Sequence, residues 1–386
     1  MKVAMYWHNG RSLGHTVEAA KVAQALVDEN AATTVAGITG AFKGLELLPT
    51  GMDVFKLPSF VNYDRETGWN AHSRIGMGYN ELFALRRDLV ELYLSRHDPD
   101  VLLVNHLPYG AEAELKPELE NRADRRNVLM LRGILFDRDK TRREYFTDEI
   151  TQWIDEHFNA IVVHTDPAIF KLQHFYEVPD QLQDRIVHVG YLGDEYRLTK
   201  SEARQALGVL EGQRFVAASM GGGQGAWPIW EALVEALKSN RSEFDQALLV
   251  TGPYLEADAV ERLLTATRNL DGVEVVSYHG DITALMKASD LFIGAAGANM
   301  LGEMIGTGCN AIAIPRQVRE PEQILHSGIL AERGLMRRSV LPDVLAGSLA
   351  ELIHTALSSP IDASAHKILL GGARRYPALL RELVAS

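Results

Sequence analysis

The sequence has little of several things that would point to particular kinds of protein. It contains a single cysteine, Cys309, among 386 residues, so it cannot form an internal disulfide and has too few thiolates for a cysteine-rich zinc site or an iron–sulfur cluster. Basic residues are in the minority, with 39 Lys and Arg against 51 Asp and Glu and a formal net charge of −12. Because gripping a nucleic-acid backbone requires a basic surface, this charge disfavours a nucleic-acid partner.

Long apolar runs are also missing, and no stretch approaches the roughly 20 residues that a membrane-spanning helix needs. The N-terminal run Met1–Trp7 is too short for the apolar part of a signal peptide and is followed at once by polar residues. Such a run is typical of a first buried strand. We therefore expect a cytoplasmic chain without a transmembrane segment, whereas peripheral membrane contact and oligomeric state stay open.

The composition is that of an ordinary globular protein, and segments typical of strands and of helices alternate along the chain. Hydrophobic residues make up 46% of the chain and charged residues 23%, and at about 150 residues per domain the length fits two domains or three. Continuous apolar runs, typical of strands buried on both faces of a parallel sheet, alternate with helical segments. These runs are Val3–Trp7, Thr33–Gly37, Val101–Asn105, Val128–Leu131, Ala160–His164, Phe215–Ser219, Ala247–Thr251, Val273–Tyr278, Leu291–Gly294 and Ala311–Pro315.

The strand–turn–helix series starts twice, which indicates two doubly wound α/β domains. Val3–Trp7 leads into a turn that ends in Gly14 and His15, and Phe215–Ser219 leads into a glycine-rich turn. We place the domains at residues 1–195 and 196–386, and we leave open whether the final amphipathic helix packs back on the N-terminal domain.

The glycine-rich turn Gly221–Gly225 is the first candidate binding element. Four of its five residues are glycines, which permit positive φ and let backbone N–H groups approach a ligand at a strand end and a helix N-terminus. This chemistry favours a diphosphate, and the alternative is a tight turn that binds nothing. No Lys-Ser or Lys-Thr pair follows and the G-x-G-x-x-G spacing is absent, so a Walker-type kinase and a dinucleotide oxidoreductase are disfavoured.

Three further groups of residues follow predicted strands. Glu303 lies in the early turns of a helix that opens near Ala298 and could hold a ribose diol; a solvated glutamate is the alternative. Polar residues from Pro315 to Gln323 suit sugar hydroxyls, or form an ordinary surface loop. His15 can serve as a general base for a hydroxyl acceptor, or can be a capping or packed histidine. A carboxylate that orients it is expected, but spacing does not identify which.

Taken together and in this order, these features resemble the family 28 glycosyltransferases of the GT-B fold, which include bacterial peptidoglycan N-acetylglucosaminyltransferases. The turn Gly221–Ala226 is similar to the family's GGSQGA turn, and Gly14-His15 is similar to the end of its GTGGH turn. The specific resemblance covers about residues 215–335, and around residues 3–30 in the N-terminal half. The donor-site signature is matched at Ser289–Gly297, Glu303, Gly306, Gly308, Pro315 and Gln323.

The resemblance implies two Rossmann-like domains that face each other across a cleft, the N-terminal one for the acceptor and the C-terminal one for the donor. It implies an inverting, metal-independent transfer from a nucleotide-sugar co-substrate, with a UDP-sugar as the expected donor and no other cofactor. The implied donor residues are Gly221, Gly222, Gly223, Gln224 and Gly225 for the diphosphate, Glu303 for the ribose, Tyr278 and His279 for the base, Gly297, Ala298 and Asn299 for phosphate and sugar, and Glu322 and Gln323 for sugar hydroxyls. The acceptor-side residues are His15 as base, with Gly14, His106 and Asp137 as candidates for acceptor contact.

Two departures from the family pattern concern the identity of the sugar that is transferred. The family's paired glutamines appear as Glu322-Gln323, and Val318 stands where the family has a histidine. We therefore expect transfer of a hexosyl or pentosyl group to a hydroxyl or amine acceptor, a small molecule or natural product before a lipid-linked one. A sugar-nucleotide 2-epimerase of the same fold and a non-catalytic nucleotide-sugar-binding subunit are the alternatives.

Overall fold

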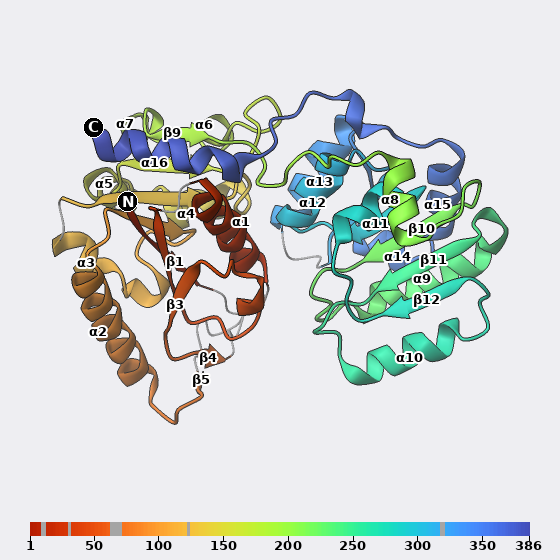
Figure 1. Ribbon diagram of the computed structural model, residues 1–386, viewed down its shortest axis with the longest axis horizontal. Helices are drawn as coiled ribbons and strands as arrows, with labels where there is room; N and C mark the ends of the chain where they lie inside the picture. The colour runs from red at the N-terminus through yellow and green to blue at the C-terminus, as the bar shows by residue number, and fades with distance from the viewer. Residues whose placement is uncertain (9–12, 30–31, 62–71, 122–123, 317–320) are drawn as a thin grey trace. The chain divides into compact units, whose positions relative to one another are not determined.

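The computed structural model describes residues 1–8, 13–29, 32–61, 72–121, 124–316 and 321–386, and these form two compact units (Figure 1). Unit 1 comprises Met1–Leu192 and Leu369–Ser386, and unit 2 comprises Gly193–Ile368. The chain thus enters unit 2 after Leu192 and returns to unit 1 at Leu369, so unit 1 is built from two separate stretches of sequence.

Unit 1 is built on a seven-stranded parallel sheet in the order β3-β2-β1-β6-β7-β8-β9. The chain runs outward from β1 to β3 and then returns to place β6 on the other side of β1, so the order reverses between β1 and β6. The strands are β1 (Lys2–Trp7), β2 (Thr34–Thr39), β3 (Met52–Lys56), β6 (Val101–Asn105), β7 (Arg126–Leu131), β8 (Ala160–Val163) and β9 (Ile186–His188), and a short hairpin joins β4 (Phe60–Val61) to β5 (His72–Ser73).

Helices cover both faces of this sheet. Val3, Met5 and Trp7 alternate along β1 and pack with α1 and the C-terminal helix α16 in one core. The two helices lie side by side, although they come from opposite ends of the chain (Figure 1). The helices of unit 1 are α1 (Gly14–Glu29), α2 (Tyr79–His97), α3 (Lys116–Asn121), α4 (Arg138–Tyr145), α5 (Asp148–His157), α6 (Leu172–Phe175), α7 (Asp180–Gln183) and α16 (Tyr376–Ala385).

Unit 2 repeats the design with a six-stranded parallel sheet in the order β12-β11-β10-β13-β14-β15. Its order reverses between β10 and β13, because β11 and β12 lie on one side of β10 and the later strands lie on the other. The strands are β10 (Phe215–Ser219), β11 (Gln246–Val250), β12 (Val273–Val276), β13 (Leu291–Ala295), β14 (Ala311–Ile314) and β15 (Arg337–Arg338).

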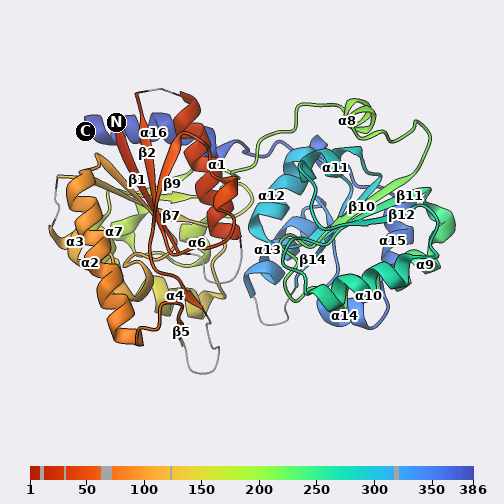
Figure 2. The same ribbon diagram turned by 60° about the horizontal axis from the view of Figure 1, so that its bottom comes forward.

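The core of unit 2 lies between this sheet and α9, α10, α14 and α15, with the fully buried Trp230 of α9 among its members. Helix α11 packs against α8 and against strands β10 and β13. It also packs against α12, which lies beside it in Figure 2. The helices are α8 (Lys200–Leu207), α9 (Trp227–Ser239), α10 (Ala257–Thr267), α11 (Ile282–Ala288), α12 (Ala298–Thr307), α13 (Pro321–Glu332), α14 (Leu341–Leu345) and α15 (Leu349–Ser358). In the part of the chain that the structure describes, no helix combines the length and apolar character needed to cross a bilayer.

The two parallel-sheet α/β domains expected from the sequence are confirmed, and the central strands match best. The predicted runs Val101–Asn105 and Phe215–Ser219 coincide with β6 and β10, both buried along their whole length. Strand β3 (Met52–Lys56) was not expected. It lies at the edge of its sheet, and its sequence MDVFK mixes exposed charges with apolar residues, so it lacks the continuous apolar run of a central strand.

Candidate active site

In each unit, several of the sequence-predicted residues lie at the carboxyl edge of the sheet where the strand order reverses. In unit 2, the glycine turn Gly221–Gly225 follows β10, and Gly297–Asn299 follow β13, its neighbour across the reversal. In unit 1, His15 follows β1 and His106 follows β6, again neighbours across the reversal. Open α/β sheets bind ligands at such switch points, so each unit presents one candidate site.

The glycine turn has the conformation that its composition predicts. The φ angles of Gly221, Gly223 and Gly225 are 64°, 86° and 68°, in the left-handed region that residues with a Cβ rarely adopt. A methyl group at Gly223 would lie 2.2 Å from the carbonyl oxygen of Thr251, whereas one at Gly221 or Gly225 would meet nothing within 4 Å. Gly223 is therefore needed for packing, and the other two glycines leave open space beside the backbone.

The loop after β11 supports the turn from one side. A methyl group at Gly252 would lie 2.1 Å from the carbonyl oxygen of Gly221, so the two backbones are in close contact. The N–H of Tyr254 donates to the carbonyl oxygen of Gly222 at 2.8 Å, and the Tyr254 ring lies beside the same glycine. The shape of the turn is thus fixed by the neighbouring loop before any ligand binds.

Helix α12 brings the second part of the unit 2 site. It starts after Gly297, where an added methyl group would meet nothing within 4 Å, and Ala298 and Asn299 form its first turn. Its N-terminus directs the positive end of the helix dipole toward the switch point, which favours an anion there. Glu303 lies one turn further along the same helix and is half-buried.

Tyr278 and His279 follow β12 at the far side of this edge. Tyr278 is 64% exposed, so its ring is available for stacking. Nδ1 of His279 lies 2.9 Å from the backbone oxygen of Asp281, the residue that caps α11. The structure therefore places both residues after the edge strand β12, which β11 separates from β10 and the glycine turn.

The segment after β14 contributes Gln323, which is buried at 7% exposure. Its side-chain Oε1 accepts a hydrogen bond from the backbone N–H of Arg316 at 3.1 Å, so the amide holds the strand end to α13. Glu322 is half-buried beside it. Val318, which stands where the family has a histidine, lies outside the described residues.

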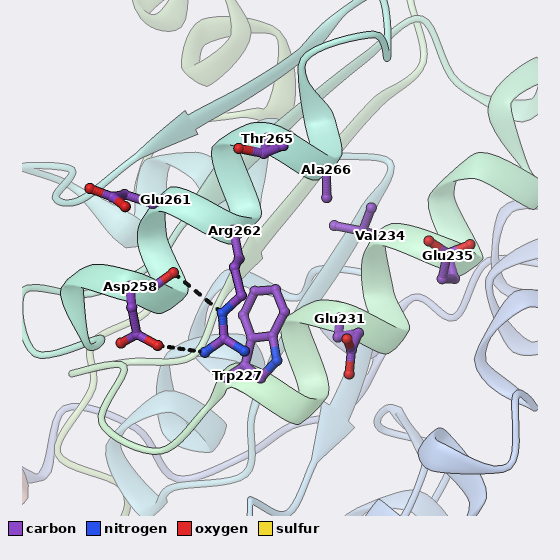
Figure 3. Close-up of a pocket in the computed structure, with 9 residues that line it drawn as sticks. All are labelled: Trp227, Glu231, Val234, Glu235, Asp258, Glu261, Arg262, Thr265 and Ala266. Carbon is purple, nitrogen blue, oxygen red and sulfur yellow. Dashed lines mark hydrogen bonds and ion pairs between the residues drawn. The ribbon is translucent and has the colours of Figure 1, made fainter.

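An open pocket of about 740 Å³ lies elsewhere on unit 2, between α9 and α10 (Figure 3). Among its lining residues is Arg262, whose guanidinium lies 4.3 Å from the centre of the Trp227 ring and pairs with Asp258 at 2.8 Å. None of the predicted donor residues, all of which the structure describes, lines this pocket. The candidate donor site is thus the sheet edge and not this groove.

In unit 1, the candidate base His15 faces a buried carboxylate. Nδ1 of His15 lies 3.6 Å from Oε2 of Glu18, one helical turn along α1. Glu18 is 3% exposed and accepts from Nδ2 of Asn105 at 3.0 Å and from Nε of Arg132 at 2.5 Å. Asn105 is the last residue of β6 and Arg132 directly follows β7, so three parts of the unit hold one carboxylate beside His15.

The electrostatics of this cluster follow from burial and the paired charges. Burial alone would raise the pKa of Glu18, but the Arg132 guanidinium and His15 outweigh it, and the pKa lies well below its usual range. Burial is the largest cause that holds the pKa of His106 well below its usual value, and the neighbouring His15 and the Arg132 guanidinium act in the same direction. At neutral pH the site therefore contains an ionised Glu18 and a neutral His106.

His106 lies beside His15, with ring centroids 5.2 Å apart. It has a positive φ of 71°, which is uncommon for a residue with a side chain and occurs often at functional sites. The rings of Phe136 and Tyr145 lie 6.3 and 5.5 Å from it. The structure thus brings His106 into the cluster, together with aromatic rings that the sequence did not single out.

The other acceptor candidates have structural partners. Asp137 is the N-cap of α4, and its carboxylate accepts from the N–H of Lys140 at 2.8 Å. Gly14 is the first residue of α1 and adjoins His15. The preceding part of the first turn, residues 9–12, lies outside the described residues. Of the predicted acceptor residues, His15 and His106 are therefore the pair that the fold brings together.

Sequence reasoning missed Glu18 and Arg132. The signal for Glu18 was its spacing, because residues i and i+3 lie on one helix face, and Ala19 and Val22 continue that buried face. A glutamate in a buried stripe needs a partner, but only the folded sheet shows that Arg132 supplies it from the end of β7.

Comparisons with known proteins agree with this geometry. Residues 218–367 match the glycosyltransferase family 28 C-terminal domain. A UDP-N-acetylglucosamine--N-acetylmuramyl-(pentapeptide) pyrophosphoryl-undecaprenol N-acetylglucosamine transferase from Caldanaerobacter subterraneus is 31% identical over 166 residues. That match covers 42% of this chain and 45% of the relative, so the chain spans less than half the length of this curated relative.

Solved structures match over nearly the whole chain. MurG from Acinetobacter baumannii has a TM-score of 0.64 at 14% identity and covers 99% of both chains. The UDP-GlcNAc 2-epimerase from Methanocaldococcus jannaschii has a TM-score of 0.61 at 14% identity and covers 100% of both. Identities this low show a shared fold. The chain therefore has the GT-B fold, and its C-terminal unit resembles the family 28 glycosyltransferases.

Proposed function

We propose that the chain is an inverting glycosyltransferase that moves a sugar from a nucleoside-diphosphate donor to a hydroxyl or amine acceptor without a metal. The observation that carries this proposal is the glycine turn at the switch point of unit 2, within the residues that match the family 28 C-terminal domain. We assign the donor to unit 2 and the acceptor to unit 1.

In unit 2, the diphosphate binds the amides of Gly221–Gly225 and the N-terminus of α12. Glu303 accepts hydrogen bonds from the ribose, and Tyr278 and His279 contact the base. Glu322 and Gln323 contact the sugar. When the bond between the anomeric carbon and the diphosphate breaks, negative charge develops on the leaving oxygen. Preorganised N–H groups and helix N-termini stabilise that charge, which is why the proposal needs no metal ion.

In unit 1, His15 acts on the acceptor. Its Nδ1 faces Glu18 at 3.6 Å, which leaves Nε2 to take the proton of the attacking hydroxyl. The acceptor oxygen forms the new bond to the anomeric carbon from the face opposite the diphosphate, and the nucleoside diphosphate leaves with the bonding electrons. Glu18 orients the ring and offsets the positive charge that the ring gains.

We propose a UDP-sugar as donor, because the curated relative is named for UDP-N-acetylglucosamine. That relative's name also gives a lipid-linked acceptor. The net charge of −12 makes an anionic membrane surface less favourable for this chain, so we propose a small-molecule acceptor.

Calorimetry with UDP, TDP, GDP and ADP tests the donor site directly. We expect UDP to bind most tightly and Glu303→Ala to weaken binding of UDP more than binding of pyrophosphate, because the ribose contact is lost. If no nucleoside diphosphate binds, the proposal is wrong.

Two controls separate the alternatives of the same fold. Incubation with UDP-N-acetylglucosamine alone gives no epimer if the chain is a transferase, whereas turnover without an acceptor would identify an epimerase. With a working acceptor, His15→Ala should reduce transfer by a factor of about 100 or more, the contribution typical of a general base. Transfer at the wild-type rate would remove His15 from the mechanism.

A further inference from the structure

The segment after β11, which supports the glycine turn, also accepts a hydrogen bond from the turn through the carboxylate of Glu256. Oε1 of Glu256 accepts a hydrogen bond from the N–H of Gly225 at 3.2 Å. Glu256 is the N-cap residue of α10, but within the described structure its side chain makes no cap bond to that helix. Its carboxylate therefore serves the turn that precedes α9, and not the helix that Glu256 itself begins.

The remaining amides of the turn differ from that of Gly225. Gly221 donates to the hydroxyl oxygen of Ser219 and Gly223 to the carbonyl oxygen of Met220, each at 3.3 Å, and both acceptors are neutral. The amides of Gly222 and Gln224 have no acceptor among the described residues. Over the same residues, Glu256 is thus the only charged group that accepts from this turn.

A bound diphosphate would meet this carboxylate. Glu256 is exposed, and the space beside Gly225 is open, so the amide that it occupies is within reach of a ligand. Phosphate oxygens and carboxylate oxygens seek the same N–H donors, and two anions at one donor repel each other. The carboxylate must then swing away or weaken the binding of the diphosphate.

We propose that Glu256 is a resident anion that competes with the nucleoside diphosphate for the glycine turn and promotes its release after sugar transfer. This inference rests on the proposed function. A free nucleoside diphosphate ends in a phosphate with a second ionisation near neutral pH, which its sugar ester lacks. Repulsion by Glu256 therefore weakens binding of the nucleoside diphosphate product more than binding of the nucleotide-sugar donor.

The test is calorimetry with UDP, UDP-N-acetylglucosamine, uridine and inorganic pyrophosphate on wild type and Glu256→Gln. Glutamine keeps the hydrogen-bonding oxygen and removes the charge. We expect UDP to bind about five-fold tighter to the variant, a smaller gain for UDP-N-acetylglucosamine, and no change for uridine, which has no phosphate. The matched control is Glu261→Gln, which removes an exposed charge from the same helix.

Each outcome is decisive. Equal or weaker UDP binding by Glu256→Gln would overturn the inference, and so would an equal gain in Glu261→Gln, which would indicate a general charge effect. If no nucleoside diphosphate binds to either protein but Glu256→Gln gains affinity for pyrophosphate, the inference holds for the turn and the proposed function fails. If pyrophosphate binding also stays unchanged in the variant, both fail.

Discussion

At the scale of single residues, the candidate acceptor site depends on the buried carboxylate of Glu18. Glu18 is buried, and Arg132 and Asn105 hold it in place beside His15. Removing one partner of a buried ion pair leaves the other uncompensated, which costs more than the pair itself contributes.

Glu18→Gln should therefore destabilise the protein by about 3 kcal/mol, because Arg132 loses its counter-charge. Urea unfolding at pH 7 measures this. The control is Glu29→Gln, which removes an exposed carboxylate of the same helix that pairs with Arg381, and should cost less than about 1 kcal/mol. Equal effects of the two substitutions would contradict the assigned role of Glu18.

His164 gives a pH dependence of known sign. Burial lowers the pKa of its imidazole to about 4, while Glu18 raises it and Arg132 lowers it further. The unfolded state has the ordinary pKa of about 6.5 and takes up the proton first, so stability is complete above that pH and is lost as the pH falls toward 4. Between pH 7.5 and 5 the loss from this residue is about 2 kcal/mol.

Measuring the unfolding free energy across this pH range, in wild type and in His164→Gln, checks that expectation. The variant should lose stability at pH 7.5 but show a flatter profile toward pH 5. A wild-type profile that is flat from pH 7.5 to pH 5 would be inconsistent with a buried neutral His164.

At the scale of elements, two glycines of the turn allow the cost of a steric clash to be measured apart from the cost of a positive φ angle. Gly223→Ala places a methyl group 2.2 Å from a backbone oxygen of the neighbouring loop, at a φ of 86°. Gly221→Ala has a similar φ of 64° but open space. The first substitution should cost about 3 kcal/mol and the second about 1 kcal/mol, because only the first adds a backbone clash to the strain.

Unfolding experiments on the two alanine variants measure this difference, and UDP titration shows whether the turn keeps its shape. Only the Gly223 variant should lose affinity through distortion. If both variants unfold with the same midpoint, the close contact with the loop after β11 does not support the turn.

The elements that the sequence predicted share a local signal. Buried central strands such as Val101–Asn105 are continuous apolar runs, which can be recognised in the sequence without the fold. The glycine turn and the helix that carries Glu303 were found in the same way. By contrast, Glu256 and Arg132 act on segments distant in sequence, and their roles became visible only once the strand order was known.

At the scale of the whole molecule, unit 1 is not continuous in sequence, because it contains both ends of the chain. The last 18 residues return to unit 1, where Ala373, Tyr376 and Leu380 join the core beneath α1. The hydroxyl of Tyr376 lies 2.6 Å from Nε2 of His164, and the carboxylate of Asp166 accepts from the N–H of Leu369. This returning segment is thus both packed and hydrogen-bonded to the unit that begins the chain.

Deleting residues 369–386 should destabilise unit 1 and leave unit 2 folded. Losing the buried Tyr376 and Leu380 side chains alone removes about 3 to 6 kcal/mol of apolar burial. Hydrogen exchange resolved by peptide should show lost protection in β1, α1 and β8, with β10 and β13 unchanged. Tyr376→Phe, which removes only the bond to His164, should cost about 1 kcal/mol. Because the core of unit 2 contains no residue from 369–386 within the described chain, equal loss of protection in β10 would mean that unit 2 depends on unit 1 for its stability.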